Sequence, residues 1–421
     1  MIRLIYSILF ALCIPFVWLK LLWRGYKSAE YRPRKLERFG WFDAPDLQHS
    51  IWFHTVSVGE LLAAEPVIRA VQQRFPGRSI VITSMTPTSS ELIRKLFGHS
   101  VFHVYAPYDV PVFVVAFLKK VKPEFLVIME TELWPNMIHK THKLGCPVVL
   151  ANARLSERSA KGYQRLAPAI TWMLDGLSLI LCQYPNDAMR FRSLGIAADK
   201  IHVTGSVKYD IDVSEDNVSE GASIRAALLP DQQVWIAAST HEGEDSIVLD
   251  VHAQLRKLFP GLVLVLVPRH PERFDRAFDL SEQRGFHTYR RTTHPCIAAD
   301  AEVFVVDTMG EMMAFYAASD IAFIGGSFVE IGGHNPIEPA ALSKPIVMGP
   351  HTFNFEAICD QLVAAGGLEV VQDPEQLRRS LAALLDDAAF AESRGLNAAG
   401  VVAGGRGAVN RVVDHLAPLI R

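Results

Sequence analysis

Short apolar runs alternate with helical stretches along most of this chain, and that alternation is the strongest constraint on its fold. Continuous apolar runs are typical of strands buried on both faces of a sheet, and the helical stretches between them, such as Leu61–Arg74 and Asn186–Leu194, suit parallel crossovers. The pattern therefore predicts an α/β protein with parallel, doubly wound sheets. The strands expected in the first half are Ile51–His54, Ser79–Thr83, Val101–Tyr105, Phe125–Met129, Pro147–Ala151, Ser178–Gln183 and Ile201–Thr204.

A polar stretch near the middle divides this alternation into two series. Residues 210–223 are rich in acids and turn formers and poor in apolar residues, which is typical of a linker. The length of 421 residues also exceeds what one hydrophobic core usually organises. We therefore expect Rossmann-like domains at 25–209 and 224–421, with ligands in a cleft between the carboxyl ends of their sheets. The strands expected in the second domain are Val234–Ser239, Leu262–Val267, Val303–Val306, Ile321–Gly325, Pro345–Met348 and Leu368–Val371.

The N-terminus carries the signal of a membrane anchor. Leu4–Leu19 is apolar apart from Ser7, and most positive charge follows the run, which argues against a cleavable signal peptide. We expect residues 1–24 to form an anchor helix with the body on the cytoplasmic side. The run is short for a full span and contains Pro15, so insertion into one leaflet is an alternative. The basic residues that could also hold anionic lipid are Lys20, Arg24, Lys27, Arg32, Arg34, Lys35 and Arg38.

Composition argues against several other classes of function. The formal net charge of −3 gives no basic excess of the kind that nucleic-acid-binding domains carry, so no nucleic-acid partner is expected. The five cysteines are odd in number and widely spaced, which indicates reduced core residues and not disulfides or zinc ligands.

The first candidate site is HTVSVGE, residues 54–60, which directly follows an expected strand. Gly59 permits a tight turn, and Glu60 falls at the start of the next helix. A carboxylate at this position can act as a general base toward a substrate hydroxyl. An acid that merely stabilises the helix dipole in the first turn explains Glu60 equally well.

A second candidate, METELWPN at residues 129–136, follows another expected strand. Glu130 and Glu132 lie two residues apart, so on an extended backbone they face the same way and raise each other's pKa. Trp134 and Pro135 then begin a helix, and capping of that helix would account for one of the two acids. The pair is a weak metal signal, and we expect no metal ion or other cofactor.

Two segments of the second half are expected to begin helices that could hold a phosphate. In the first, Thr308 is the expected N-cap and Glu311 is its capping-box partner. In the second, Asn335 is the expected N-cap, Pro336 is the first helical residue and Glu338 is the capping-box partner. The unpaired N–H groups of a helix start attract anions. Helix capping alone explains both segments about as well.

Two cations are expected at the predicted cleft. Arg269 follows the strand Leu262–Val267 and suits a phosphate or carboxylate clamp. Lys208 lies near the end of the first domain and would enter the cleft from there. A salt bridge between the domains is the alternative role for either residue.

Taken together, an ordered series of motifs closely resembles the lipid A-specific 3-deoxy-D-manno-octulosonic acid (Kdo) transferases of Gram-negative bacteria, over nearly the whole chain. The resemblance implies a GT-B glycosyltransferase, which is a class with two Rossmann-like domains. It implies transfer of Kdo, with inversion, from CMP-Kdo to the tetraacylated lipid A precursor at the inner membrane. The motifs are HTVSVGE, ETELWPN, ANARLSERS, GSVKYD, STHEGE, VPRHPERF, DTMGEM, GGSFVEIGGHNPIEPAA and MGPHTFNFEAI.

The same resemblance implies roles for individual residues. Glu60 matches the general base of the family, and Glu130 and Lys208 match its transition-state-stabilising positions. CMP leaves with a single phosphate, whose charge cationic side chains and helix starts can neutralise, so no metal ion is required. The residues on the segments that hold CMP are Pro268, Arg269, Met309, Gly310, Glu311, Asn335, Pro336, Ile337 and Glu338.

The acceptor side is less specified by the sequence. Arg154, Ser156, Arg158 and Lys161 follow another strand and are candidates for the phosphates of the acceptor or the carboxylate of Kdo, with surface salt bridges as the default alternative. Two other functions fit part of the pattern. One is a different GT-B enzyme, such as a UDP-sugar epimerase or a lipid-disaccharide synthase, and the other is a non-enzymatic bilobal binding protein.

Overall fold

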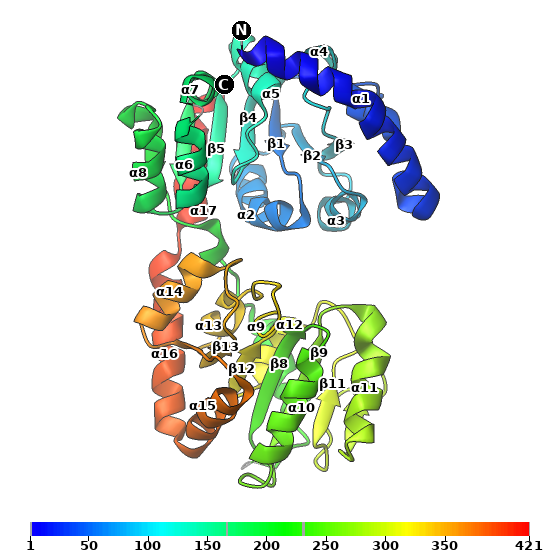
Figure 1. The fold of residues 1–421 in the computed structure, drawn as a ribbon, viewed down its shortest axis with the longest axis vertical. Coiled ribbons are helices and arrows are strands. Elements are labelled where there is room, and N and C mark those ends of the chain that lie inside the picture. The colour runs from blue at the N-terminus through cyan, green and yellow to red at the C-terminus, as the bar shows by residue number, and fades with distance from the viewer. Residues whose placement is uncertain (1, 166, 230–231, 421) are drawn as a thin grey trace. The chain divides into compact units, whose positions relative to one another are not determined.

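The chain forms two units, each built around one parallel sheet (Figure 1). The computed structural model describes residues 2–165, 167–229 and 232–420. The first unit comprises the chain up to Asp210 together with the segment from Arg406 onward, and the second comprises Ile211–Gly405. Two sheets of this kind confirm the predicted pair of Rossmann-like units.

The first sheet has seven strands in the order β3-β2-β1-β4-β5-β6-β7. Every neighbouring pair is parallel. Most of its residues are buried on both faces, as their continuous apolar sequences predict. The strands are β1 Ser50–His54, β2 Ile80–Ser84, β3 Phe102–Tyr105, β4 Pro123–Met129, β5 Val148–Ala153, β6 Leu179–Cys182 and β7 Ile201–Val203.

Helices cover both faces of this sheet and build two cores. Successive strand residues point to opposite faces, so Trp52 packs in one core while Ile51 and Phe53 pack in the other. Helices α4, α5, α7 and α8 contribute to the first core, and α2, α3 and α17 contribute to the second. The helices of the unit are α1 Ile2–Lys27, α2 Val58–Arg74, α3 Pro87–Phe97, α4 Pro111–Val121, α5 Pro135–Lys143, α6 Glu157–Arg165, α7 Ala167–Leu174, α8 Pro185–Ser193 and α17 Ala408–Leu416.

The second sheet repeats the plan, in the order β10-β11-β9-β8-β12-β13-β14, again with parallel pairs. Its strands are β8 Val234–Thr240, β9 Val263–Pro268, β10 Thr288–Arg290, β11 Val303–Val305, β12 Ile321–Ile324, β13 Ile346–Met348 and β14 Leu368–Val370. Its helices are α9 Glu215–Arg225, α10 Glu244–Leu255, α11 Phe274–Gln283, α12 Met312–Ala318, α13 Ile337–Ala341, α14 Glu356–Ala364, α15 Pro374–Asp386 and α16 Ala388–Gly405.

The segment predicted as a linker, residues 210–223, is mostly helical, and the boundary between the two units lies at its start, between Asp210 and Ile211. Ser214 caps α9 by accepting a hydrogen bond from the N–H of Asn217 at 3.2 Å. Gly221 lies against α12 so closely that a Cβ added to it would come within 2.6 Å of the Ala317 Cβ. Gly221, counted among the turn formers, thus permits close helix packing here.

The C-terminal boundary also differs from the predicted second domain, 224–421. Helix α17 returns to the first unit and packs on α2. Val409, Val412 and Leu416 of α17 are buried in the same core as Leu61 and Ile68 of α2. Because these contacts join opposite ends of the chain, no local pattern in the sequence indicates them.

One strand, β10, was not predicted. Its residues are only half-buried, and it lies at the outer edge of the sheet, so Thr288–Arg290 lacks the continuous apolar run that marks the other strands.

Each sheet has a point at which the direction of strand addition reverses. In the first sheet this point lies between β1 and β4, and in the second it lies between β8 and β12. Doubly wound sheets bind ligands outside the carboxyl ends of the strands at such points. The loops after these four strands are therefore the places to search for a site.

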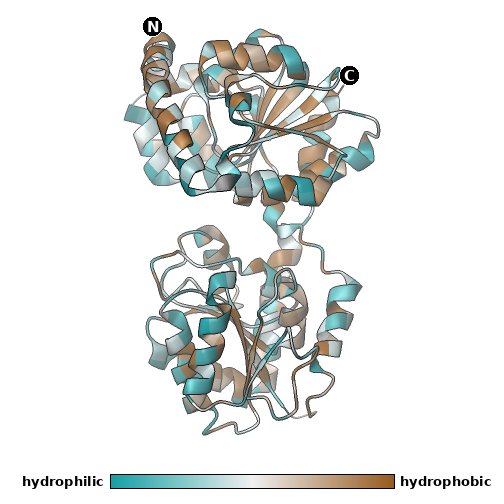
Figure 2. Cartoon of the chain, turned by 90° about the vertical axis from the view of Figure 1, so that its right-hand side faces the viewer, coloured by the Kyte–Doolittle hydropathy of each residue, from teal (hydrophilic) through white to brown (hydrophobic). Residues whose placement is uncertain are grey.

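Helix α1 is the one candidate membrane span among the described residues. It has 26 residues, longer than the apolar run from which it was predicted, and its segment Arg3–Lys27 has a mean hydropathy of 2.1. Only 11% of that apolar window is buried. Figure 2 shows many hydrophobic residues along α1, and hydrophobic residues also dominate the inner strands of both units.

Candidate active site

Glu60 lies beyond the carboxyl end of β1, in the first turn of α2. Ser57 is the N-cap residue, and its Oγ accepts a hydrogen bond from the Glu60 N–H at 3.3 Å and donates one to Glu60 Oε1 at 2.8 Å. The other carboxylate oxygen accepts a hydrogen bond from the N–H of Val56 at 2.8 Å. This capping-box geometry fixes the position of the carboxylate, so the predicted helix-stabilising role is present.

The protonation of Glu60 distinguishes it from an ordinary capping acid. The side chain is only 8% exposed, and burial raises its pKa to about 7. The hydrogen bonds from Val56 and Ser57 oppose this rise, while the nearby charges of Glu132 and Glu130 add to it. A carboxylate with a pKa near neutrality is well matched to general-base catalysis.

Glu130 directly follows β4, the strand beside β1 at the reversal point. Its backbone has a φ of 58°, in the left-handed region that non-glycine residues seldom adopt. Its carboxylate Oε1 lies 3.3 Å from Nζ of Lys208. Strained backbone of this kind is concentrated at functional sites, where the surrounding structure holds it in place.

The ion pair between Glu130 and Lys208 lies within one unit. Both residues belong to the first unit, so this ion pair does not join the two units. The structure thus brings three of the predicted residues, Glu60, Glu130 and Lys208, to the edge of one sheet. Glu132 lies there as well and accepts a hydrogen bond from Nε1 of Trp134 at 3.1 Å.

The four residues predicted to bind the acceptor lie around the start of α6, after β5. Ser156 accepts a hydrogen bond from the N–H of Ser159 at 3.2 Å, so it caps the helix. Lys161 pairs with Glu157 at 2.6 Å, with both side chains more than two-thirds exposed. Arg154 and Arg158 are exposed. The surface salt bridge named as the default alternative is therefore present for Lys161.

In the second unit, Pro268 is the last residue of β9 and Arg269 follows it. The N–H of Arg269 donates to the carbonyl oxygen of Thr240 at 3.0 Å, which fixes the start of the loop beside β8. The arginine side chain is exposed and makes no ion pair with another side chain in the described part of the chain. Its guanidinium group is therefore available to an anionic ligand.

The expected cap at Thr308 is wrong. Helix α12 begins only at Met312, and the Thr308 hydroxyl instead donates to the carboxylate of Glu311. That carboxylate also accepts a hydrogen bond from Arg291 at 2.6 Å, which lowers the pKa of Glu311. Met309 is 60% exposed and Gly310 has a φ of 94°, so this loop presents its backbone and the methionine to solvent.

The second expected helix start is close to the prediction. Helix α13 begins at Ile337, one residue later than expected, and Oδ1 of Asn335 accepts a hydrogen bond from the Ile337 N–H at 3.1 Å. Nδ2 of Asn335 donates to Glu338 at 3.2 Å. Burial raises the pKa of Glu338, while Asn335 and the charge of Arg269 oppose the rise.

Glycine is required where this loop leaves the sheet. Ser239 breaks the register of β8 against β9 and has a φ of 58°. A Cβ on Gly325, which follows β12, would lie 2.7 Å from the Ser239 carbonyl oxygen. The two loops at the reversal point can therefore approach each other only with glycine at 325.

Three histidines complete this edge of the second sheet, and they were not among the predicted site residues. Nε2 of His241 lies 2.8 Å from Nε2 of His334, and the ring of His270 packs edge-on against His241 at 5.3 Å. Burial, and next the charge of Arg269, lower the pKa of His334 to about 4. Burial also lowers the pKa of His241, so His241 and His334 both favour the neutral form, in which an imidazole can donate one hydrogen bond and accept another. The three histidines follow β8, β9 and β12. Because these strands were predicted, the positions of the histidines after them could have marked them as candidate site residues.

No group of three or more His, Cys, Asp or Glu side chains is arranged to hold a metal ion within residues 2–165, 167–229 and 232–420.

The two Rossmann-like sheets, each with a reversal point, define a protein of the GT-B fold. A solved structure with this fold is UDP-GlcNAc 2-epimerase from Neisseria meningitidis, which is 17% identical and matches 88% of this chain and 100% of its own with a TM-score of 0.60. At that identity the likeness concerns the fold alone.

Sequence relatives define the family. A family model described as 3-deoxy-D-manno-octulosonic-acid transferase (kdotransferase) matches residues 34–211. The 3-deoxy-D-manno-octulosonic acid transferase of Haemophilus influenzae is 41% identical over 99% of both chains, and that of Bordetella pertussis is 32% identical over 96% of both. The chain belongs to the 3-deoxy-D-manno-octulosonic acid transferase family and is a glycosyltransferase, as the motifs predicted.

Proposed function

We propose that this glycosyltransferase transfers Kdo, with inversion, from CMP-Kdo to the lipid A precursor, and that Glu60 is its general base. The full-length identity to Kdo transferases supports the sugar that is transferred. The observation that carries the mechanism is the buried Glu60 carboxylate, held beyond the end of β1 with a pKa of about 7.

In the proposed reaction the acceptor hydroxyl oxygen attacks the anomeric carbon of Kdo. Its proton passes to a carboxylate oxygen of Glu60, the new C–O bond forms, and the bond from the anomeric carbon to the phosphate of CMP breaks. CMP leaves with the bonding electron pair. Because Glu60 accepts two hydrogen bonds through its carboxylate, the oxygen that takes the proton is already oriented.

Lys208 is proposed to stabilise the negative charge that develops as CMP leaves. Glu130, 3.3 Å away, orients the ammonium group and is itself held by its unusual backbone. A carboxylate alone would repel the anionic donor. The positive charge of Lys208 offsets the negative charge of Glu130, so this repulsion is removed. Glu130 is thus a positioning residue in this proposal, and Lys208 is the group that touches the donor.

The nucleotide of CMP-Kdo is proposed to bind the second unit at the loops after β8, β9 and β12. Arg269 and the neutral His241 and His334 supply a cation and hydrogen-bonding imidazoles there. Asn335, in the loop before α13, supplies an amide, and Glu338, in the first turn of α13, supplies a buried acid. We further propose that catalysis needs no metal ion, because these protein groups supply the charge that a metal would.

The acceptor and the location of the enzyme are proposed together. An acceptor that is itself a membrane lipid requires an enzyme at the membrane, and α1 is long and apolar enough to attach the chain there. We place the body on the cytoplasmic side of the inner membrane because basic residues follow the apolar run.

Incubation with CMP-Kdo and detergent-dispersed lipid A precursor tests the proposal. Mass spectrometry should show the precursor gaining one or more Kdo units and CMP appearing in equal number. UDP-sugars should give no product, and CMP but not UDP should raise the melting temperature. Product formed from a UDP-sugar, with none from CMP-Kdo, would contradict the assignment of the donor.

A further inference from the structure

A basic cavity of about 990 Å³ lies along the outer edge of β3 in the first unit, beside the second half of α1. Its walls come from α1, from the segment that follows it, from the last turn of α3 and from β3. None of the described residues that line it belongs to the loops after β1 or β4 that carry Glu60 and Glu130. The lining side chains with a charge, an imidazole or an indole are Trp18, Arg32, Arg34, Lys35, Glu37, Trp41, Asp43, Arg94, His99 and His103.

The cations that were predicted as one basic cluster serve two different purposes here. Arg34 pairs with Glu37 at 2.6 Å and donates to the His103 carbonyl oxygen at 2.8 Å, so it covers the edge of β3. Arg38 is 4% exposed and donates to the Met85 carbonyl oxygen at 3.0 Å. Both are structural, and neither is available to an anionic ligand.

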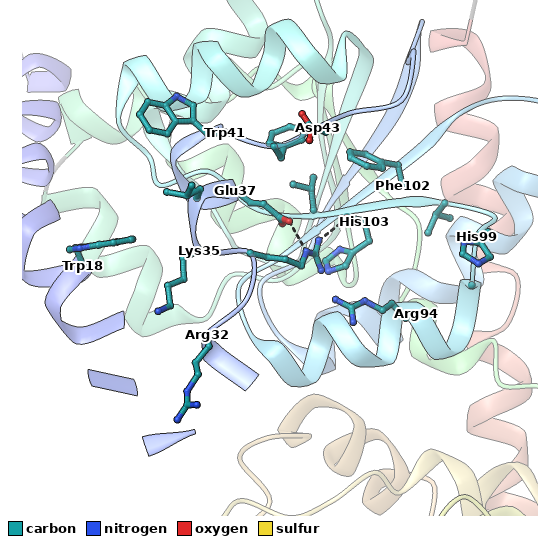
Figure 3. A pocket seen from close by; sticks show the side chains of 16 residues that line it. Trp18, Arg32, Lys35, Glu37, Trp41, Asp43, Arg94, His99, Phe102 and His103 are labelled. Carbon is teal, nitrogen blue, oxygen red and sulfur yellow. Dashed lines mark hydrogen bonds and ion pairs between the residues drawn. The ribbon is translucent and has the colours of Figure 1, made fainter. Parts of the chain in front are cut away.

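Three other cations remain at the cavity. Arg32, Lys35 and Arg94 make no ion pair with a carboxylate in the described part of the chain. Nε of Arg32 donates to the Gly25 carbonyl oxygen at 2.7 Å, which leaves its two terminal amino groups for a ligand. Figure 3 shows Arg94 of α3 extending toward the side on which Arg32 and Lys35 lie, with Trp18 farther to that side and Trp41 near the top of the view. Asp43 is the one lining acid apart from the paired Glu37. The cavity therefore carries an excess of positive charge.

Polar contacts hold α1 flat against the first unit. Tyr6 hydrogen-bonds to Asp109, and the Ser7 hydroxyl donates to Oδ1 of Asn136 at 3.0 Å. Asp109 and Asn136 are 1% and 0% exposed, so they are parts of the folded body. A helix that crossed a bilayer would carry Tyr6 and Ser7 into the hydrocarbon and break both contacts.

The opposite face of α1 is apolar and uncovered. Its seven large side chains between Leu4 and Leu19 are each 51–74% exposed, and they are Leu4, Ile5, Ile8, Leu9, Leu12, Phe16 and Leu19. A helix with one docked face and one apolar face suits insertion into the plane of one leaflet. Trp18, on the same helix, lines the cavity, so the cavity lies directly beside the helix that would insert.

We propose that this cavity binds the phosphate-bearing headgroup of an anionic membrane phospholipid, while α1 lies in the plane of the leaflet. The proposal rests on the proposed membrane attachment. Arg32, Lys35 and Arg94 contact the phosphate, and the indoles of Trp18 and Trp41 lie at the interface, where tryptophan is favoured. A lipid is the source of the phosphate, because one wall of the cavity is the membrane-bound helix itself.

Vesicle binding by the full-length chain tests the proposal. The probes are vesicles of phosphatidylcholine alone and vesicles with about a third phosphatidylglycerol, an anionic composition. Lys35→Gln with Arg94→Gln should weaken binding to the anionic vesicles by roughly 25-fold, at about fivefold per cation, and leave binding to neutral vesicles unchanged. The matched control removes equal charge elsewhere on the unit, through Lys95→Gln and Arg192→Gln, and should change binding less than twofold.

Several results would overturn the assignment. Equal losses of binding in the two double variants would mean that diffuse surface charge, and not the cavity, attracts the vesicles. If the double variant folds poorly, the single variants Arg94→Gln and Lys95→Gln provide the same comparison. Competition by inorganic phosphate at millimolar concentration would indicate a soluble ligand. A raised KM for the acceptor in neutral detergent micelles would make the cavity part of the acceptor site. CMP-dependent thermal stabilisation, measured in the same samples, reports on the proposed function independently of the lipid result.

Discussion

Nζ of Lys208 lies 3.3 Å from Oε1 of Glu130, and this pair links the loop after β4 to the end of the first unit. The lysine and glutamate side chains are 29% and 20% exposed, so the contact is screened in part by solvent. Pairs of this kind contribute less than about 1 kcal/mol to the free energy of unfolding. The ion pair therefore adds little to stability, and its role in the proposed mechanism can be tested without unfolding the protein.

Lys208→Ala should lower kcat by about 100-fold, because it removes a cation from the developing charge. Glu130→Gln should lower kcat by about tenfold, since it only loosens the position of the lysine. The double variant should be no slower than Lys208→Ala alone. Steady-state kinetics would check this, with Arg69→Ala, which breaks the surface pair with Glu65, as the control. Additive losses would mean that the two residues act separately.

The rate of transfer should depend on pH through Glu60. Because its pKa is raised to about 7, kcat should increase about tenfold per pH unit below 7 and level off above it. Glu60→Gln should abolish transfer and leave the affinity for CMP unchanged. An unchanged pH profile in a Glu60→Asp variant of reduced activity would place the titrating group elsewhere.

The same carboxyl group should affect stability in the opposite sense. Its pKa is raised from 4.5 to about 7 on folding, so its favourable contribution is complete below about 4.5 and is lost as the pH rises through 7. Glu60→Gln should therefore raise the free energy of unfolding at pH 8, by about 1–3 kcal/mol. Urea denaturation at pH 5 and pH 8 would measure this, and an equal effect at both pH values would contradict it.

Arg269→Ala should weaken CMP binding by about 10- to 100-fold, since a charged hydrogen bond to phosphate contributes about 1.5–3 kcal/mol. The melting temperature without ligand should not change, because the side chain is exposed. Titration calorimetry with CMP gives the affinity directly. The control is Arg276→Ala, which breaks the exposed pair with Glu242 in the same unit and should leave CMP binding intact.

Asp109 should determine how firmly α1 is attached to the body. Its carboxylate accepts hydrogen bonds from the N–H groups of Asn136 and Met137 at 2.9 and 2.7 Å. Asp109→Ala leaves both buried donors unpaired and should lower the free energy of unfolding by about 2–4 kcal/mol. Asp109→Asn keeps one acceptor and should cost about half as much. Limited proteolysis of the α1 junction would report detachment of the helix.

Transfer should persist after metal removal. Activity measured in excess EDTA should equal the untreated rate, because Lys208 and Arg269 supply the positive charge in the proposed mechanism. Loss of activity that added Mg²⁺ restores would contradict the metal-independent mechanism.

Much of the fold could be predicted because a strand that is buried on both faces has a continuous apolar sequence. Thirteen of the strands coincide with apolar runs, and the edge strand Thr288–Arg290 was missed because it has none. The position of Glu60 followed from one strand and one helix start. Its raised pKa did not, since that depends on packing and on Glu130 and Glu132 from another loop.

Other features lay beyond local pattern. The spacing of Thr308 and Glu311 fits a capping box, yet the acid pairs with Arg291, which is distant in sequence. The neutral histidine pair His241 and His334 required two loops to meet at Gly325. Ser7 was noted only as an interruption of an apolar run, and the structure shows it donating to Asn136.

The return of α17 to the first unit has a consequence for how the chain can be divided. The core around Leu61 includes Val409, Val412 and Leu416, which follow the whole second unit in the sequence. The segment Ile211–Gly405 is continuous and can be expressed without breaking the core of the first unit. A fragment that stops at Asp210 would instead expose the apolar face of α2 that α17 covers, so it should aggregate unless α17 is supplied.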